Sequence, residues 1–154
     1  MACFEVFKLS NTYERKIAMT MSFFLKLNMV SLLYGLIFFL SMALQLNYYR
    51  LLRLTGWAGD KLDLFLLIVQ LVGLIVATIF MYRLSVTWLG HRRWVYATMI
   101  LWFPYTVMFT MVFAYLFPIS HRGDMPVPVQ GLILLVMLGG YPLYIAIISL
   151  TART

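Results

Sequence analysis

The chain has 154 residues, of which 64% are hydrophobic and 11% are charged, and its net charge is +7. Soluble domains are about one quarter charged, and a chain this short cannot hide so much apolar surface in one aqueous core. The composition therefore excludes an ordinary soluble domain and indicates a membrane protein. Because the basic residues flank apolar runs, we expect lipid headgroups to be their partners, and no nucleic acid.

Residues 1–21 are mixed in polarity and form a predicted cytoplasmic N-terminal segment before the first apolar run. Asn11 followed by Glu14 is a pattern that can cap a short amphipathic helix, and a weakly structured extension is the alternative. Met19 and Met21 leave the translation start open. Cys3 is the only cysteine, so one chain can form no internal disulfide or redox pair.

Residues 22–154 form a predicted transmembrane domain, because four apolar runs are each long enough to cross about 30 Å of hydrocarbon. The predicted spans are residues 23–46, 62–82, 94–117 and 129–150. The sequence therefore predicts an all-α integral membrane protein with four transmembrane helices in an up-down bundle. Between the first two spans, a short helix around Arg53 should lie on the membrane and end at Gly56 and Gly59, with Asp60 capping the second span.

Two pairs of small residues, each four apart, occur in the first two spans. Ser31 with Gly35 and Gly73 with Ala77 are predicted helix-packing positions, because small side chains let a second helix approach closely. The sequence does not show which helices these positions would meet.

Proline lies inside each of the last two spans. We predict kinks at both sites, because proline removes one helical hydrogen bond, and interrupted helices can form a binding path. The alternative is that the prolines only bend the helices for packing. The predicted groove residues are Pro104, Tyr105, Gly140, Tyr141 and Pro142.

A basic loop separates the second and third spans. Arg83, His91, Arg92 and Arg93 are predicted to hold a lipid phosphate, because arginine binds phosphate through a two-pronged fork. The alternative is that this loop only fixes the orientation of the protein. Lys and Arg favour the cytoplasmic side, and eight of the twelve would lie on the side of this loop and both termini. We therefore expect a multi-pass protein of the plasma (inner) membrane with both termini cytoplasmic.

Several kinds of chemistry find no support in the sequence. No ionisable residue is predicted at mid-membrane depth, where ion-coupled transport would need one. His91 and His121 fall in loops predicted on opposite sides of the membrane, so one chain cannot use both for a metal or a haem. No nucleophile elbow is present. We therefore expect no metal, no cofactor and no enzymatic activity.

One short motif suggests a function. Arg92-Arg93-Trp94-Val95-Tyr96 resembles the Arg-Arg-Trp-x-Phe stretch of the GtrA-like family, whose members are linked to moving polyprenyl-phosphate sugars across membranes. The resemblance covers these five residues and implies the carriage of an anionic lipid.

By elimination, the leading prediction is a small non-enzymatic membrane subunit that assembles through its helices with other membrane proteins or with further copies of itself. The alternatives are a small carrier or flippase for an anionic lipid, either a polyprenyl phosphate or a phospholipid, and an immunity-type protein that blocks a membrane toxin.

Overall fold

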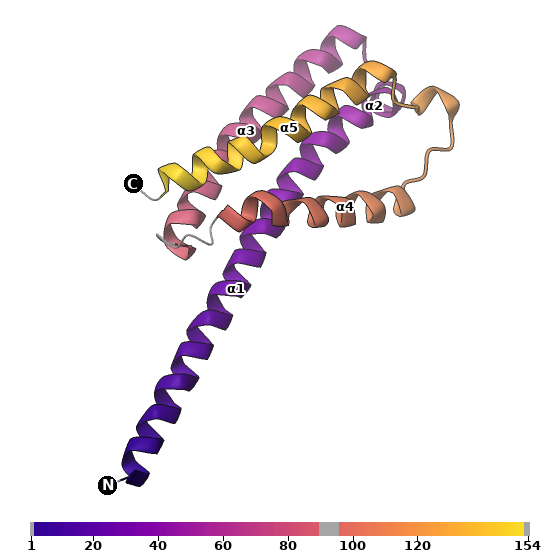
Figure 1. The fold of residues 1–154 in the computed structure, drawn as a ribbon. Coiled ribbons are helices and arrows are strands. Elements are labelled where there is room, and N and C mark those ends of the chain that lie inside the picture. The colour runs from indigo at the N-terminus through magenta and orange to yellow at the C-terminus, as the bar shows by residue number, and fades with distance from the viewer. Residues whose placement is uncertain (1, 90–95, 153–154) are drawn as a thin grey trace.

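The computed structural model describes residues 2–89 and 96–152, and for residues 2–18 it describes the backbone alone. Within these described residues, the main helical elements follow one another as Figure 1 shows. They are α1 (Ala2–Leu46), α2 (Tyr48–Thr55), α3 (Gly59–Trp88), α4 (Thr98–Leu116), the short 3₁₀ helix η2 (Arg122–Asp124) and α5 (Pro128–Thr151).

The predicted all-α class is confirmed, since four of these helices are long and apolar enough to cross a membrane and the described residues contain no strand. The four helices alternate in direction, as an up-down bundle requires (Figure 1). At one end lie α2, η2 and the first turns of α3 and α5, and we name this the α2 end. The last turns of α3 and α5 and the first turn of α4 lie at the other end, which we name the terminal end.

The first helix is much longer than the predicted span. α1 is one helix of 45 residues, or about 67 Å at 1.5 Å per residue, which is more than twice the thickness of a hydrocarbon core. Its N-terminal half projects away from the other helices (Figure 1). The backbone is helical on both sides of Asn11, so Asn11 does not begin a helix.

The short helix predicted between the first two spans is confirmed as α2. Gly56 ends it in the left-handed conformation (φ 64°), and its backbone N–H donates to the Leu52 carbonyl. The predicted cap at Asp60 is wrong, because α3 already begins at Gly59 and Ala58 occupies the N-cap position without a side-chain bond. Asp60 instead lies in the first turn of α3, where a carboxylate still favours the positive end of the helix dipole.

Both internal prolines are accommodated within continuous helices. α4 runs through Pro104 and α5 runs through Pro142 with no non-helical residue at either site. Neither proline therefore interrupts its helix. A proline removes the hydrogen bond to the residue four positions earlier and its ring crowds that carbonyl, but neighbouring helices and local adjustments satisfy the freed groups in membrane helices.

The core lies where α4 crosses α1, the most extensive helix contact in the molecule. α1 supplies the fully buried Tyr34 and the nearly buried Phe38, and α4 supplies Trp102. The rings of Phe38, Trp102 and Tyr141 of α5 meet with centroids 4.8–4.9 Å apart. From this crossing α4 diverges from α3 and α5 (Figure 1).

Candidate functional site

A groove opens between α1, α3 and α5, and Phe38 separates it from the crossing with α4. Its volume is about 620 Å³, and its walls are mostly apolar. Small residues from α3 and α5 line part of it. The lining residues are Ile37, Phe38, Leu40, Ser41, Leu44, Val69, Gln70, Gly73, Leu74, Ala77, Met137, Gly140, Tyr141 and Tyr144.

The small residues of the groove leave part of its volume unfilled by protein atoms. A methyl group built on Gly73 or on Gly140 would meet no atom within 4 Å. Toward the terminal end, the hydroxyl oxygens of Thr78 and Tyr144 lie 2.9 Å apart and join α3 to α5. The open part of the groove therefore lies on the α2 side of this hydrogen bond.

One polar side chain in the groove has no partner. Gln70 is half-buried, and its amide makes no hydrogen bond within the described part of the chain. It follows Asp63, in the second turn of α3, by seven residues, or about 10 Å along the helix. That depth is beyond the reach of a glutamine side chain to the headgroup layer. An amide left unsatisfied in hydrocarbon is costly, so Gln70 favours a polar occupant of the groove.

The structure separates the predicted groove residues. Gly140 and Tyr141 line the groove, and the Tyr141 hydroxyl also donates to the Tyr34 carbonyl over 2.7 Å. Pro104 and Tyr105 do not line it, since they lie on α4, and the Tyr105 hydroxyl donates to Asn28 Oδ1 of α1 over 2.9 Å. Pro142 is half-buried and does not line the groove either.

The two small-residue pairs lie in different surroundings. Gly35 is buried against α4, and a methyl group on it would come within 2.8 Å of both the Trp102 carbonyl oxygen and the Tyr105 Cβ. Ser31 is fully buried one turn earlier and donates to its own helix at Leu27. Gly73 and Ala77 instead face the groove.

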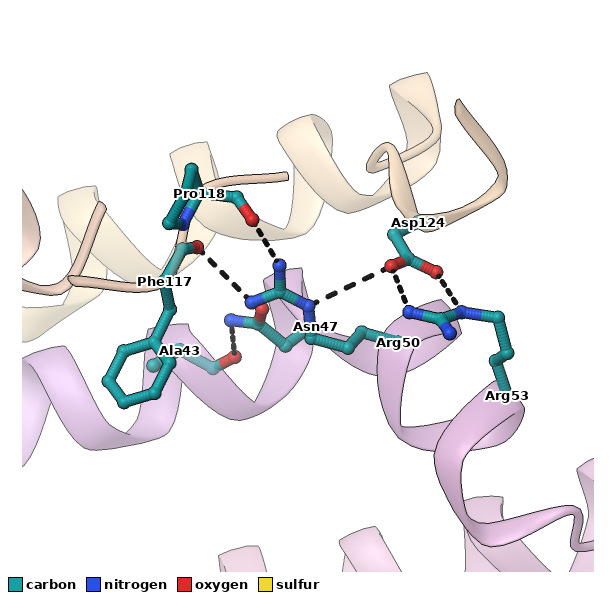
Figure 2. Close-up of polar contacts among 7 residues, drawn as sticks. All are labelled: Ala43, Asn47, Arg50, Arg53, Phe117, Pro118 and Asp124. Carbon is teal, nitrogen blue, oxygen red and sulfur yellow. Dashed lines mark hydrogen bonds and ion pairs between the residues drawn. The ribbon is translucent and has the colours of Figure 1, made fainter. Parts of the chain in front are cut away.

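At the α2 end, three charged residues join the helix α2 to the short helix η2. The Arg53 guanidinium donates to both oxygens of Asp124, over 2.9 and 2.7 Å, and Arg50 lies 3.8 Å from the same carboxylate (Figure 2). Arg50 also donates to the carbonyls of Phe117 and Pro118. We name Arg50, Arg53 and Asp124 the loop clasp, because they hold α2 against the segment between α4 and α5.

The pKa shifts of Asp124 and Arg53 agree with the hydrogen bonds of the loop clasp. The hydrogen bonds from Arg53 hold the pKa of the Asp124 carboxyl below its usual value, and the same contact raises the pKa of Arg53. Asp124 is only 3% exposed, although its helix η2 lies at the edge of the bundle. Sequence reasoning missed this pair, because the partners are 71 residues apart and no local spacing connects them.

The predicted phosphate-binding residues are only partly described. Arg83 lies exposed in the last turns of α3, near the terminal end. His91, Arg92 and Arg93 lie outside the described residues, so the arrangement of this cluster stays a prediction. Among the described residues, no three His, Cys, Asp or Glu side chains gather as a metal site would need.

The chain matches no family model, no curated protein and no solved structure.

Proposed function

We propose that this protein is a small, non-enzymatic membrane subunit that assembles with another membrane protein, whose transmembrane helix enters the groove between α1, α3 and α5. The observation that carries the proposal is the Gln70 amide, which has no hydrogen-bond partner among the described residues and lines a groove that the protein's own side chains leave open. A lipid acyl chain would fill the volume but could not bond to the amide. A helix with a polar side chain at that depth would fill the groove and also bond to the Gln70 amide. Interhelical hydrogen bonds stabilise such contacts by about 1 kcal/mol.

The shape of the groove favours a different protein over a second copy. A symmetric dimer with its two-fold axis through the groove would place one groove against the other, and two concave surfaces do not fill one another. A head-to-tail contact between copies would leave one groove open or require a closed ring. The convex face of a helix from another protein complements a concave surface, and the small residues Gly73, Ala77 and Gly140 allow its backbone to come close.

The proposed location is the plasma membrane, with the terminal end facing the cytoplasm. The support is the excess of Lys and Arg on the N-terminal segment, the loop that follows α3, and the C-terminal tail. The main exceptions, Arg50 and Arg53, each have a local partner in the loop clasp, which explains why arginines stand at the α2 end.

Substitution of Gly73 by leucine tests the proposal. A Cβ atom at this position meets no atom within 4 Å, so the fold should hold, while the rest of the leucine side chain enters the groove. The wild-type chain, purified from its native host in mild detergent, should carry a stoichiometric membrane-protein partner, measured by light scattering and mass spectrometry. Gly73→Leu should lose at least about 90% of that partner, because a side chain of this size blocks close backbone approach.

Gly139→Leu is the matched control. Gly139 is also an exposed mid-helix glycine with no atom near its Cβ position, but it does not line the groove. The control variant should keep the partner. A wild-type chain that purifies alone, or a partner retained equally by both variants, would contradict the proposal.

A further inference from the structure

A second, smaller pocket lies at the terminal end, between α1 and the end of α3. Its volume is about 250 Å³, and it shares no lining residue with the groove. We name it the inner pocket. It is lined by Met19, Ser22, Phe23, Lys26, Thr87, Trp88 and Leu89.

The two nitrogen groups of the inner pocket are unused donors. Neither Lys26 nor Trp88 makes a hydrogen bond or an ion pair within the residues that the structure describes. An ammonium and an indole N–H donate but cannot accept. The two hydroxyl groups are already committed as donors, Ser22 to the Met19 carbonyl and Thr87 to the Arg83 carbonyl. These hydroxyl oxygens can still accept, but the charged ammonium of Lys26 and the Trp88 N–H favour a ligand that offers acceptors.

The charge around the inner pocket is positive. Arg83 is exposed one helical turn before Thr87, and Lys26 itself is exposed. Among side chains that the structure describes, the carboxylates all lie toward the α2 end, on the first two turns of α3 and on η2. No described carboxylate competes for Lys26, so an anion is favoured over a neutral acceptor.

The depth of the inner pocket points to a lipid. Lys26 precedes Asn47 by 21 residues, which is about 31 Å along α1, and Arg83 follows Asp63 by 20 residues, or about 30 Å along α3. Both distances equal the thickness of a hydrocarbon core, so Lys26 and Arg83 mark its boundary at the terminal end. Trp88 lies just outside that boundary, where tryptophan is enriched. Phe23, Met19 and Leu89 give the pocket an apolar wall beside its donors.

We propose that the inner pocket binds the phosphate of an anionic phospholipid, with Lys26 and the Trp88 indole N–H as its donors. The headgroup oxygens lie against these two side chains, and the acyl chains enter the hydrocarbon on the α2 side of Lys26 and Arg83. Zwitterionic lipids carry the same phosphate but also a cation, which neighbouring Arg83 and Lys26 disfavour. The inference stands apart from the proposed protein partner, because the two sites use different residues.

Native mass spectrometry of the purified full-length chain tests this proposal. We add phosphatidylglycerol or phosphatidylcholine at equal concentrations and measure the apparent Kd of each. The wild-type chain should bind phosphatidylglycerol more tightly. Lys26→Gln should weaken phosphatidylglycerol binding roughly tenfold, because it removes a charge-assisted hydrogen bond, and Lys26→Arg should restore most of it. Trp88→Phe keeps the ring, loses the donor and should weaken binding a few-fold.

Lys61→Gln is the matched control, since Lys61 is an exposed lysine at the opposite end of α3. It removes the same charge and should leave binding unchanged. Equal affinities for Lys26→Gln and Lys61→Gln, or equal binding of the two lipids, would overturn the proposal. Competition by millimolar inorganic phosphate would show instead that the pocket binds free phosphate. Unchanged thermal unfolding midpoints without added lipid show that the variants are folded.

Discussion

Replacing Asp124 by alanine is expected to lower the thermal unfolding midpoint of the detergent-solubilised protein by on the order of 10 °C. The reason is that Asp124 is the one carboxylate in the described part of the chain that Arg50 and Arg53 share. Its loss leaves two guanidinium groups without an anion, and of these contacts only the bonds from Arg50 to the Phe117 and Pro118 carbonyls still hold α2 to the segment before α5. Scanning fluorimetry of the tryptophan signal measures the effect.

Two comparisons separate the loop clasp from a general effect of charge. Arg122→Ala removes an exposed charge from the same short helix and should leave the midpoint within about 1 °C of the wild type. Asp124→Asn should differ from the wild type at pH 7, and the difference should begin to shrink below about pH 4 and vanish only below the lowered pKa of Asp124, where the carboxyl is protonated in the folded protein too. A midpoint for Asp124→Ala equal to that of Arg122→Ala would contradict the role of the loop clasp.

Gly35→Ala is expected to destabilise the protein by about 1–3 kcal/mol, the range found when atoms are forced into a packed core. The methyl group would come within 2.8 Å of the Trp102 carbonyl oxygen and 3.1 Å of the Thr106 backbone nitrogen. The clash is with backbone, so it can be relieved only by moving α4 away from α1. That movement would also strain the bond from the Thr106 hydroxyl to the Gly35 carbonyl, now 3.1 Å long.

The free energy of unfolding, measured by titration with a denaturing detergent, checks this expectation. Gly73→Ala provides the control, because it adds the same methyl group at a position with no atom within 4 Å. It should leave stability unchanged or raise it slightly, since alanine favours the helix more than glycine does. Equal stabilities of the two variants would mean that α4 does not cross α1 at Gly35.

Local sequence features were enough to predict the helical elements. Hydropathy located all four long helices because lipid requires an unbroken apolar run, and Gly56 marked the end of α2 because its left-handed conformation favours glycine. The ends of the helices were predicted less accurately than their positions. For example, α3 extends to Trp88, six residues beyond the predicted span. A helix can continue past the hydrocarbon boundary, and hydropathy does not detect that continuation.

Contacts between distant segments could not be predicted in the same way. The pair Ser31 and Gly35 resembled the pair Gly73 and Ala77, yet the first packs inside the molecule and the second faces open space. Only the fold decides which face of α1 meets α4. Gln70 was visible as a polar residue in an apolar run, but its importance depends on having no partner, which only the arrangement of α1, α3 and α5 reveals.

Site-specific photocrosslinking in native membranes tests the proposed assembly most directly. A diazirine side chain of leucine size is placed at Leu74, which lines the groove, or at Val76, which is 60% exposed and does not line it. We predict one discrete adduct with a membrane protein from position 74, none from position 76, and loss of the adduct in Gly73→Leu. Lipid adducts alone from position 74, or the same pattern from both positions, would contradict a protein helix in the groove.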